Sequence, residues 1–193
     1  MRIIAGKYRS RILKSLKGLA LRPTSDRLRE TLFNVLGPAI VGSRFLDVFA
    51  GTGAVGIEAL SRGAAEAIFI ENHAPAAKLI RQNLDSLKIT TGYTILTADA
   101  LTALQKLAAR HTPSTPPFDF VFVDPPYAAH DDYLRTLEFL GSNSASLLTP
   151  RALIIFEHHH KFHLPEQSGH LRRTRLLKQG DAALSFFRFS AGP

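Results

Sequence analysis

The sequence predicts an α/β fold with a mainly parallel, seven-stranded sheet, helices on both faces and an antiparallel hairpin at the C-terminal end. Short apolar runs alternate with amphipathic stretches from residue 45 onward, a pattern typical of α/β domains. Several of these runs are almost continuously apolar, as expected for strands that are covered on both faces. A glycine-rich turn follows the first run and leads into the first helix of the series.

The elements are predicted in chain order from these patterns. Strands are expected at 45–49, 67–70, 93–96, 118–123 and 152–156, and a closing hairpin at 173–177 and 184–189. Helices are expected between them, at 55–61, 75–87, 100–110 and 132–140. An earlier helix begins after Ser25, a favourable N-cap, and ends at Gly37-Pro38.

The N-terminal residues 2–15 are expected to form two short strands around Gly6. A segment of this length cannot form a hydrophobic core of its own. It must therefore pack on the rest of the chain or become ordered when a partner binds. We therefore predict a basic β-hairpin extension at 1–21 and a single larger domain at 22–193.

Composition narrows the class of protein. The chain has 193 residues, of which 45% are hydrophobic and 21% charged, an ordinary globular balance that argues against a mainly disordered chain. The absence of cysteine excludes disulfides and thiolate metal sites. There is no apolar run of about 20 residues and no secretory signal pattern. We expect a cytoplasmic protein without membrane contact.

Positive charge is concentrated at the two ends of the chain. The net charge is +8, with +7 in residues 1–30, −3 in residues 31–150 and +4 in residues 151–193. A clustered basic surface is the electrostatic footprint of a phosphate-backbone partner. The alternative is a basic surface that binds no polyanion.

The glycine turn Gly51-Thr-Gly53-Ala-Val-Gly56 is the first candidate site. Glycine permits a sharp turn and a close approach of the backbone to a ligand. Glu71 ends the next strand, 20 residues after Gly51, where a carboxylate can accept hydrogen bonds from ribose hydroxyls. This spacing by itself fits NAD as well as S-adenosylmethionine.

Asp47 favours S-adenosylmethionine over NAD, and Asp99 is a third candidate carboxylate. Asp47 lies inside the strand before the turn, where burial costs free energy unless the acid is hydrogen-bonded or meets a cation. S-adenosylmethionine offers an ammonium and a sulfonium, whereas the pyrophosphate of NAD would repel the acid. Asp99 follows the third strand and could accept a hydrogen bond from an adenine amino group, or cap the helix that begins at Ala100.

The sharpest motif is Asp124-Pro125-Pro126-Tyr127, which ends the fourth strand. Proline fixes φ and supplies no N–H, so the loop is stiff. Asp124 and the Pro125 carbonyl are then preorganised acceptors, and Tyr127 offers a flat face for a base. Two acceptors beside an aromatic ring suit an exocyclic amino group, whose nitrogen could attack a methyl-sulfonium in line. The alternative is a rigid turn whose tyrosine belongs to the core.

Together, Asp47-x-Phe49-x-Gly51-x-Gly53 and Asp124-Pro-Pro-Tyr127 resemble the motifs of Rossmann-like class I S-adenosylmethionine-dependent methyltransferases that act on amino nitrogens. Enzymes acting on DNA adenine or cytosine, or on protein glutamine, share this pair. The N-terminal segments Met1-Arg-Ile-Ile-Ala-Gly-Lys-Tyr-Arg9 and Arg22-Pro-Thr-Ser-Asp-Arg-Leu-Arg-Glu30, with Leu32-Phe-Asn34, resemble the RsmD family. That family methylates the N2 amino group of a guanine in bacterial 16S ribosomal RNA.

The resemblance runs from Met1 to about Tyr127 and implies a set of roles. It implies catalytic roles for Asp124, Pro125, Pro126 and Tyr127. It implies S-adenosylmethionine binding, with S-adenosylhomocysteine as the product, by Asp47, Phe49, Gly51, Gly53, Glu71, Asp99 and Ala100. Candidate RNA contacts are Arg2, Lys7, Arg9, Arg11, Arg22, Arg27 and Arg29. The implied partner is 16S rRNA, in the small ribosomal subunit or an assembly intermediate, with no obligate protein partner.

Other interpretations stay open at this point. A DNA or protein amino-methyltransferase would share the chemistry, an NAD-dependent oxidoreductase would share only the glycine turn and Glu71, and a non-catalytic RNA-binding factor would share only the fold. The histidines His158, His159, His160 and His163 stay unassigned. With no cysteine and no clear carboxylate spacing beside them, no metal is expected.

Overall fold

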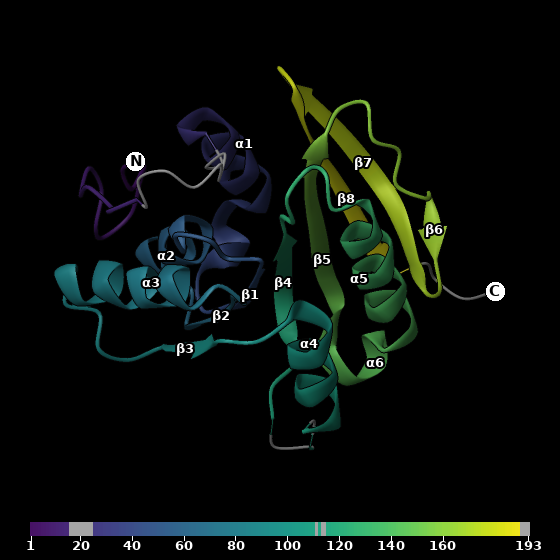
Figure 1. Ribbon diagram of the computed structural model, residues 1–193, viewed down its shortest axis with the longest axis horizontal. Coiled ribbons are helices and arrows are strands. Elements are labelled where there is room, and N and C mark those ends of the chain that lie inside the picture. The colour runs from purple at the N-terminus through teal and green to yellow at the C-terminus, as the bar shows by residue number, and fades with distance from the viewer. Residues whose placement is uncertain (16–24, 111, 113–114, 190–193) are drawn as a thin grey trace. The chain divides into compact units, whose positions relative to one another are not determined.

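The computed structural model describes residues 1–15, 25–110, 112 and 115–189, and the chain falls into two compact units (Figure 1). Unit 1 spans Met1–Asp99 and unit 2 spans Ala100–Pro193. The elements of unit 1 are α1 (Asp26–Leu36), the 3-10 helix η1 (Gly37–Ile40), β1 (Arg44–Val48), α2 (Ala54–Ser61), β2 (Glu66–Ile70), α3 (Ala74–Ser86) and β3 (Tyr93–Leu96). Those of unit 2 are α4 (Ala100–Ala109), β4 (Phe118–Val123), α5 (His130–Ser142), α6 (Ser144–Leu147), β5 (Leu148–His159), β6 (Gln167–Ser168), β7 (Leu171–Gln179) and β8 (Ala182–Phe189).

Unit 1 is built on three parallel strands in the order β3-β2-β1. The register pairs Val48 with Ile70 and Ile70 with Leu96, so the carboxyl ends of the strands meet at one edge. Helix α2 packs on β1 and β2, and α3 packs on β3. Segments that follow β1 and β2 therefore meet at this edge, as the strand-turn-helix pattern predicts.

Helix α1 confirms the predicted capping. The Ser25 Oγ accepts a hydrogen bond from the Leu28 N–H at 3.1 Å, and the helix ends at Leu36. Gly37 and Pro38 do not leave the helical path at once but open the single turn of η1. Proline is compatible with the first turn of a helix because its missing N–H has no partner there.

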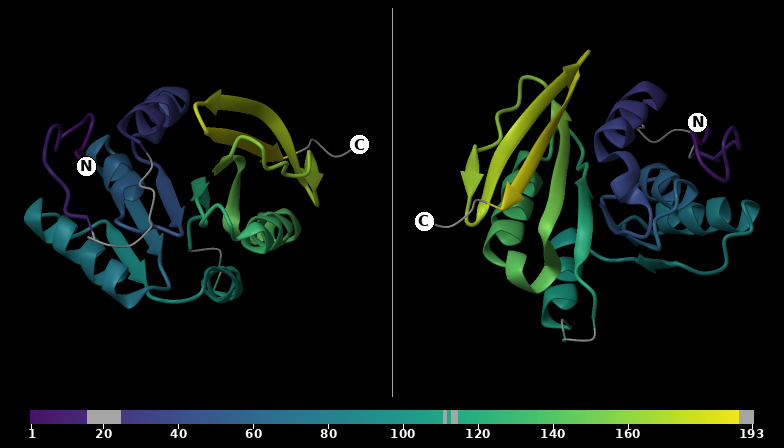
Figure 2. Two further views of the ribbon diagram at one scale, coloured as in Figure 1. Left: turned by 45° about the horizontal axis from the view of Figure 1, so that its top comes forward. Right: turned by 180° about the vertical axis from the view of Figure 1, so that it is seen from behind.

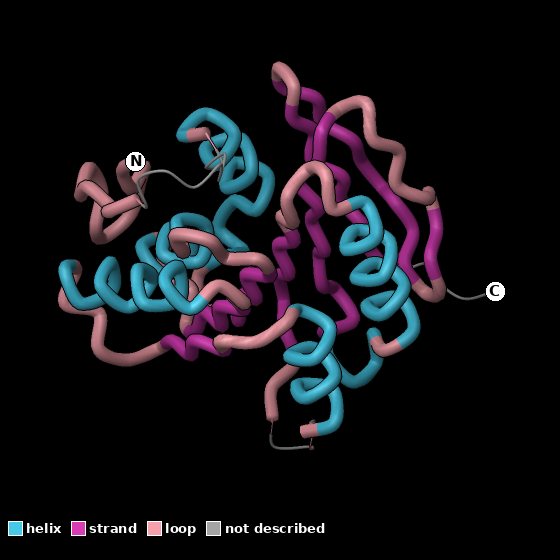
Figure 3. Tube along the Cα trace, viewed as in Figure 1, coloured by secondary structure: helices cyan, strands magenta, loops and turns pink. Residues whose placement is uncertain are grey.

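The N-terminal segment, residues 1–15, differs from the predicted hairpin. Its two arms run antiparallel, but they share one isolated bridge between Arg2 and Ile12 instead of a ladder, and the segment is drawn as loop in Figure 3. Ile3 and Leu13 are almost fully buried in an apolar cluster with residues of α2, β2 and α3. Burial of each such side chain contributes about 1.5–3 kcal/mol. The segment thus packs on its own unit.

Polar side chains of α2 and α3 bind backbone groups of the N-terminal segment. The buried carboxylate of Glu58 accepts the N–H groups of Ile4 at 2.8 Å and Ala5 at 3.0 Å. The Ser61 hydroxyl accepts the Tyr8 N–H at 3.0 Å. The buried Asn83 amide binds both the N–H and the carbonyl of Lys14. These groups are thus paired with helix side chains, while the two arms are joined to each other by the Ile3 N–H to the Arg11 carbonyl and the Leu13 N–H to the Met1 carbonyl, both at 3.0 Å.

Unit 2 combines parallel and antiparallel pairing. Strands β4 and β5 are parallel, whereas β5–β8, β8–β7 and β7–β6 are antiparallel, which confirms the predicted C-terminal hairpin (Figure 2). Strand β5 is longer than expected, and the described residues hold eight strands rather than seven. The extra strand β6 has only two residues, neither of them apolar, so its pairing with β7 leaves no hydrophobic pattern in the sequence.

The structure also bears on membrane spans and on the predicted division into domains. None of the helices in the described part of the chain has the length and apolar character needed to cross a bilayer. The division into an extension at 1–21 and a domain at 22–193 stays a prediction, because its boundary falls within residues 16–24, outside those described.

Candidate cofactor and amino-group sites

The glycine turn joins β1 to α2 in unit 1 and depends on glycine at two positions for different reasons. Gly51 has a left-handed φ of +54°, and a Cβ there would meet nothing within 4 Å, so the outer side of the turn is open. Gly56 lies in α2, where a Cβ would collide with the Phe69 ring on β2. The first glycine therefore permits the turn, and the other lets the helix pack closely on the sheet.

Asp47 lies beneath the turn, on β1, and is 2% exposed. Its Oδ2 accepts the Gly56 N–H at 2.8 Å, near the start of α2. Burial raises the pKa of Asp47 to about 8, the Gly56 hydrogen bond opposes this rise, and the charge of Glu71 adds to it. A carboxyl with such a raised pKa is stabilised as an anion when a cation comes close, which is the property expected of a partner for a positively charged cofactor.

Glu71 follows β2, and its carboxylate accepts a hydrogen bond from the glycine turn. Its Oε2 accepts the Gly51 N–H at 2.7 Å, and its Oε1 accepts the His73 N–H at 2.8 Å. Each carboxylate oxygen keeps a second acceptor position for a ligand hydroxyl. Phe49, the residue after β1, has a φ of +64°, a conformation that is strained for a non-glycine residue and is found mainly at functional sites.

The acid after β3 is placed as expected at the strand end. Asp99 is exposed and stands directly before α4, whose first residue Ala100 is buried. The predicted cofactor residues from Asp47 to Asp99 thus share the strand-end edge of unit 1. Their contact with a cofactor stays a prediction.

The Asp124–Tyr127 loop follows β4 in unit 2. Asp124 and Tyr127 are half-buried, Pro125 is buried and Pro126 is exposed. The Tyr127 ring meets His159, at the end of β5, edge-on, with centroids 5.6 Å apart and an interplanar angle of 81°. The loop is thus held between β4, α5 and the end of β5, and it brings acceptors and an aromatic ring together as the sequence predicts.

Tyr133 is the residue that the sequence analysis missed. It lies in the first turns of α5, is fully buried, and its hydroxyl donates to the Pro125 carbonyl at 2.9 Å. Burial raises the pKa of this phenol above its ordinary range, and the charges of Asp124, Tyr127 and Glu157 raise it further. Nothing in the sequence distinguishes Tyr133 from an ordinary core aromatic.

The predicted RNA contacts divide into three groups. Five of them are exposed on unit 1, as a phosphate-binding surface requires: Arg2, Lys7, Arg9, Arg11 and Arg27. Arg22 lies outside the described residues. Arg29 is a correction, because its side chain is fully buried and donates to the Arg2 carbonyl at 2.6 Å and to Asp26 at 2.7 Å. Its charge ties α1 to the N-terminal segment and is not presented to solvent.

The histidines at the end of β5 have distinct surroundings. His158 is buried between the His159 carbonyl at 2.9 Å and the Ser185 hydroxyl at 2.8 Å. Burial lowers its pKa, and the positive charges of Arg173, His163 and His159 lower it further, against the hydrogen bond to the His159 carbonyl. One nitrogen donates to a carbonyl and the other accepts from a hydroxyl, so His158 is a satisfied, neutral core residue.

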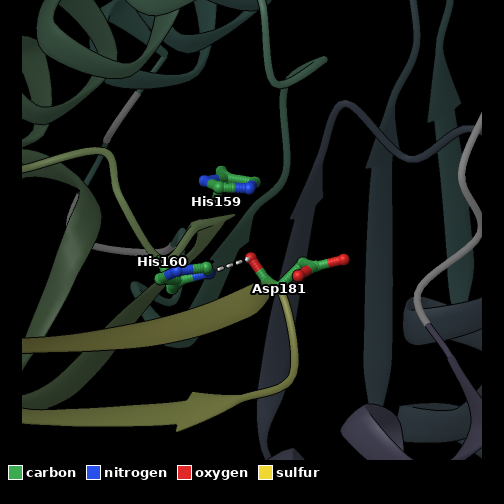
Figure 4. A group of neighbouring side chains, drawn as sticks. All are labelled: His159, His160 and Asp181. Atoms are coloured by element: carbon green, nitrogen blue, oxygen red, sulfur yellow. Dashed lines mark hydrogen bonds between the residues drawn. The ribbon is translucent and has the colours of Figure 1, made fainter.

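His159, His160 and Asp181 form a group with metal-ligand chemistry, in which one ligand atom from each lies within 4.8 Å of the others (Figure 4). The Nδ1 of His159 accepts the Lys161 N–H at 3.1 Å, so in the neutral ring Nε2 carries the proton. His160 contacts the Asp181 backbone carbonyl, at 3.2 Å, and the Asp181 carboxylate points away from the His160 ring. We assign no metal to this group, because a metal would have to break the His159 bond and turn the carboxylate.

Known proteins share this architecture. The solved structure of the Escherichia coli protein yhhF has a TM-score of 0.80 and 36% identity, covering 100% of this chain and 99% of that one. The strand-turn-helix order and this likeness define the Rossmann-like fold of class I methyltransferases. The family model described as conserved hypothetical protein 95 matches residues 1–188. The chain therefore belongs to that family, the RsmD family of methyltransferases.

Two relatives indicate how far the likeness extends. The Bacillus subtilis protein YlbH is 36% identical over 188 residues, which cover 97% of this chain and 98% of the relative. A Haemophilus influenzae protein named ribosomal RNA small subunit methyltransferase D is 42% identical over 158 residues, covering 81% of this chain and 78% of the relative. The likeness thus includes both units and is not confined to the shared glycine turn.

Proposed function

We propose that this chain transfers a methyl group from S-adenosylmethionine to the exocyclic N2 amino group of a guanine in 16S rRNA of the small ribosomal subunit. The observation that carries the proposal is the Asp124–Tyr127 loop, whose Pro125 carbonyl is held by Tyr133 at 2.9 Å. The family and the small-subunit rRNA methyltransferase name of the Haemophilus relative support the substrate class.

Unit 1 binds the cofactor in this proposal, and its three acidic side chains fit a cationic nucleoside. Asp47 is a buried acid whose raised pKa a cation would lower again. Glu71 accepts ribose hydroxyls with its second acceptor positions, and Asp99 accepts from the adenine amino group. Phe49, Gly51 and Gly53 shape the surface around them, and Ala100, which follows Asp99 in the chain, stays a predicted contact. When bound, S-adenosylmethionine supplies an electrophilic methyl group on sulfur, and S-adenosylhomocysteine is the product.

The Asp124–Tyr127 loop receives the guanine. The Asp124 carboxylate and the Pro125 carbonyl accept hydrogen bonds from the two amino hydrogens, and this orients the nitrogen lone pair away from the ring system. As the N–C bond to the methyl group forms, the C–S bond breaks to give S-adenosylhomocysteine, and the nitrogen loses one proton to solvent. Tyr127 stacks on the base, and Pro126 keeps the loop stiff. These residues contribute by positioning the reacting groups. In well-oriented systems, positioning lowers a reaction barrier by on the order of 7–11 kcal/mol.

The exposed basic residues of unit 1 bind rRNA phosphates. Arg2, Lys7, Arg9, Arg11 and Arg27 are the described candidates. Because hydrogen bonds to α2 and α3 fix the backbone of the N-terminal segment, this backbone needs no ordering when RNA binds, and only the exposed side chains lose freedom. A ribosomal substrate, complete or still in assembly, places the protein in the cytoplasm.

The decisive experiment incubates purified protein with radiolabelled S-adenosylmethionine and small subunits from cells that lack the enzyme, followed by nucleoside analysis. We expect label in N2-methylguanosine of 16S rRNA, none with the variant Asp124→Ala, and normal labelling with Asp131→Ala, which removes an exposed acid of α5. Cofactor binding without label in RNA would direct the search to DNA or protein amides. Binding of NAD instead of S-adenosylmethionine would overturn the proposal.

A further inference from the structure

Tyr133 is a buried polar residue of unit 2 that is bonded directly to the Asp124–Tyr127 loop. Its hydroxyl donates to the Pro125 carbonyl at 2.9 Å, and its ring is fully buried. The proposed acceptor set does not include this residue. Its bond nevertheless ends on one of the two oxygens that the proposed reaction uses.

The Pro125 carbonyl needs such a partner because of the residues around it. It belongs to the peptide bond between two prolines, which has no N–H, and Pro125 itself has none. The chain therefore offers this carbonyl no adjacent donor that could set its direction. A carbonyl oxygen accepts two hydrogen bonds, so the Tyr133 bond leaves one acceptor position available.

The ring of Tyr133 packs in a cluster of aromatic side chains. It lies 4.9 Å from the ring of Phe162, which in turn stacks on His130 with centroids 4.7 Å apart. His130 is the first residue of α5, and Phe162 follows β5. The ring that carries the hydroxyl is thus packed in an aromatic cluster, and its hydrogen bond restrains the Pro125 carbonyl.

We propose that Tyr133 is a positioning residue for methyl transfer, which fixes the Pro125 carbonyl in the direction that receives one hydrogen of the substrate amino group. This inference rests on the proposed function. The raised pKa of the phenol keeps the hydroxyl protonated, and therefore a donor, throughout the physiological pH range. Loss of the hydroxyl should slow the chemical step and leave the affinities for cofactor and subunit nearly unchanged.

The chain offers a matched pair of variants. Tyr133→Phe removes the hydroxyl and keeps the ring. Thr136→Val removes another buried hydroxyl from the same helix, and the Thr136 Oγ1 has no hydrogen-bond partner among the described residues. Both variants delete one buried oxygen from α5, but only the first one acts on the loop.

Single-turnover transfer to small subunits and cofactor affinity are measured for the wild type and both variants. We expect the transfer rate of Tyr133→Phe to fall by about tenfold or more, because small misplacements of reacting groups are costly, while Thr136→Val stays close to the wild type. The cofactor Kd and the KM for subunits should change by less than about threefold in both. An unchanged rate in Tyr133→Phe, or an equal loss in both variants, would overturn the inference.

Hydrogen exchange of the amides at 127–132 provides a second readout that needs no substrate. In this stretch the Ala129 N–H is bonded to the Pro126 carbonyl at 2.7 Å. We expect faster exchange there in Tyr133→Phe and not in Thr136→Val. If the wild type methylates no subunits, the proposed function fails, and unchanged exchange in Tyr133→Phe would then overturn the positioning role independently.

Discussion

The Glu58 carboxylate accepts the backbone N–H of Ile4 at 2.8 Å, across 54 residues of sequence. The same carboxylate accepts the Ala5 N–H, and it forms an ion pair with Arg62, whose Nε–H donates to it at 2.7 Å. Glu58 is fully buried, so these donors are what compensates its desolvation. A charged residue in the middle of α2 thereby determines where the basic N-terminal segment lies.

Replacement of Glu58 by Gln should loosen the N-terminal segment. The Gln side chain would place an NH₂ group, which is a donor, against backbone N–H groups that need an acceptor. Each buried N–H left without an acceptor costs about 1–3 kcal/mol. We expect a lower free energy of unfolding by urea and faster hydrogen exchange at Ile4 and Ala5. The matched control is Glu66→Gln, since Glu66 also pairs with an arginine at 2.7 Å but bonds no N-terminal amide. Equal effects in the two variants would contradict this role.

The exposed cations of the N-terminal segment should set the salt dependence of RNA binding. Because Ile3 and Leu13 are buried, deletion of the segment would also expose core, so single charge removals are the cleaner test. Lys7→Ala, Arg9→Ala and Arg11→Ala should each reduce the slope of log K against log salt by about 0.7–0.9 for each phosphate that the side chain neutralises. Lys106→Ala, on the exposed side of α4, serves as the control, and a slope unchanged in all three would remove the segment from the interface.

Asp47 should make stability depend on pH in a predictable direction. Its pKa is raised from 3.8 to about 8 in the folded chain, so the folded state holds a proton that the unfolded state has released between these values. The protonated Asp47 therefore contributes fully to the free energy of unfolding below about pH 4. This contribution falls as the pH rises towards 8, by at most about 1.4 kcal/mol per pH unit. In Asp47→Asn the free energy of unfolding should lack this decline. Parallel pH profiles for the two proteins would disprove the raised pKa.

Asp124 should be essential for transfer and unimportant for cofactor binding. We expect Asp124→Ala to abolish methyl transfer while S-adenosylmethionine affinity, measured by calorimetry, stays within about threefold, or about 0.7 kcal/mol. A loss of cofactor binding would instead place Asp124 in the cofactor site.

Tyr127 should act through its ring rather than its hydroxyl. The ring already makes an edge contact with His159 at 5.6 Å, and the proposed base would use its face. Turnover should therefore fall much more in Tyr127→Ala than in Tyr127→Phe. Equal defects in the two variants would be inconsistent with stacking.

Local patterns in the sequence were sufficient for most of the secondary structure. Strands β3 and β4 lie at the predicted residues, and Ser25 caps α1 as expected. The strand β6 was missed because it has only two residues, neither of them apolar, and so leaves no hydrophobic pattern in the sequence. Arg29 was misassigned because an arginine in a basic segment looks the same in sequence whether its partner is a phosphate or the Arg2 carbonyl.

The sequence alone determined the α/β class, the turn from Gly51 to Gly56 and the stiff loop from Asp124 to Tyr127, because glycine and proline act on the backbone at their own positions. Only the tertiary structure decided which distant groups meet. The Glu58 bonds to Ile4 and Ala5, the Glu71 bond to Gly51 and the Tyr133 bond to Pro125 each join residues from different elements. Such contacts depend on packing and burial, which neither propensity nor spacing encodes.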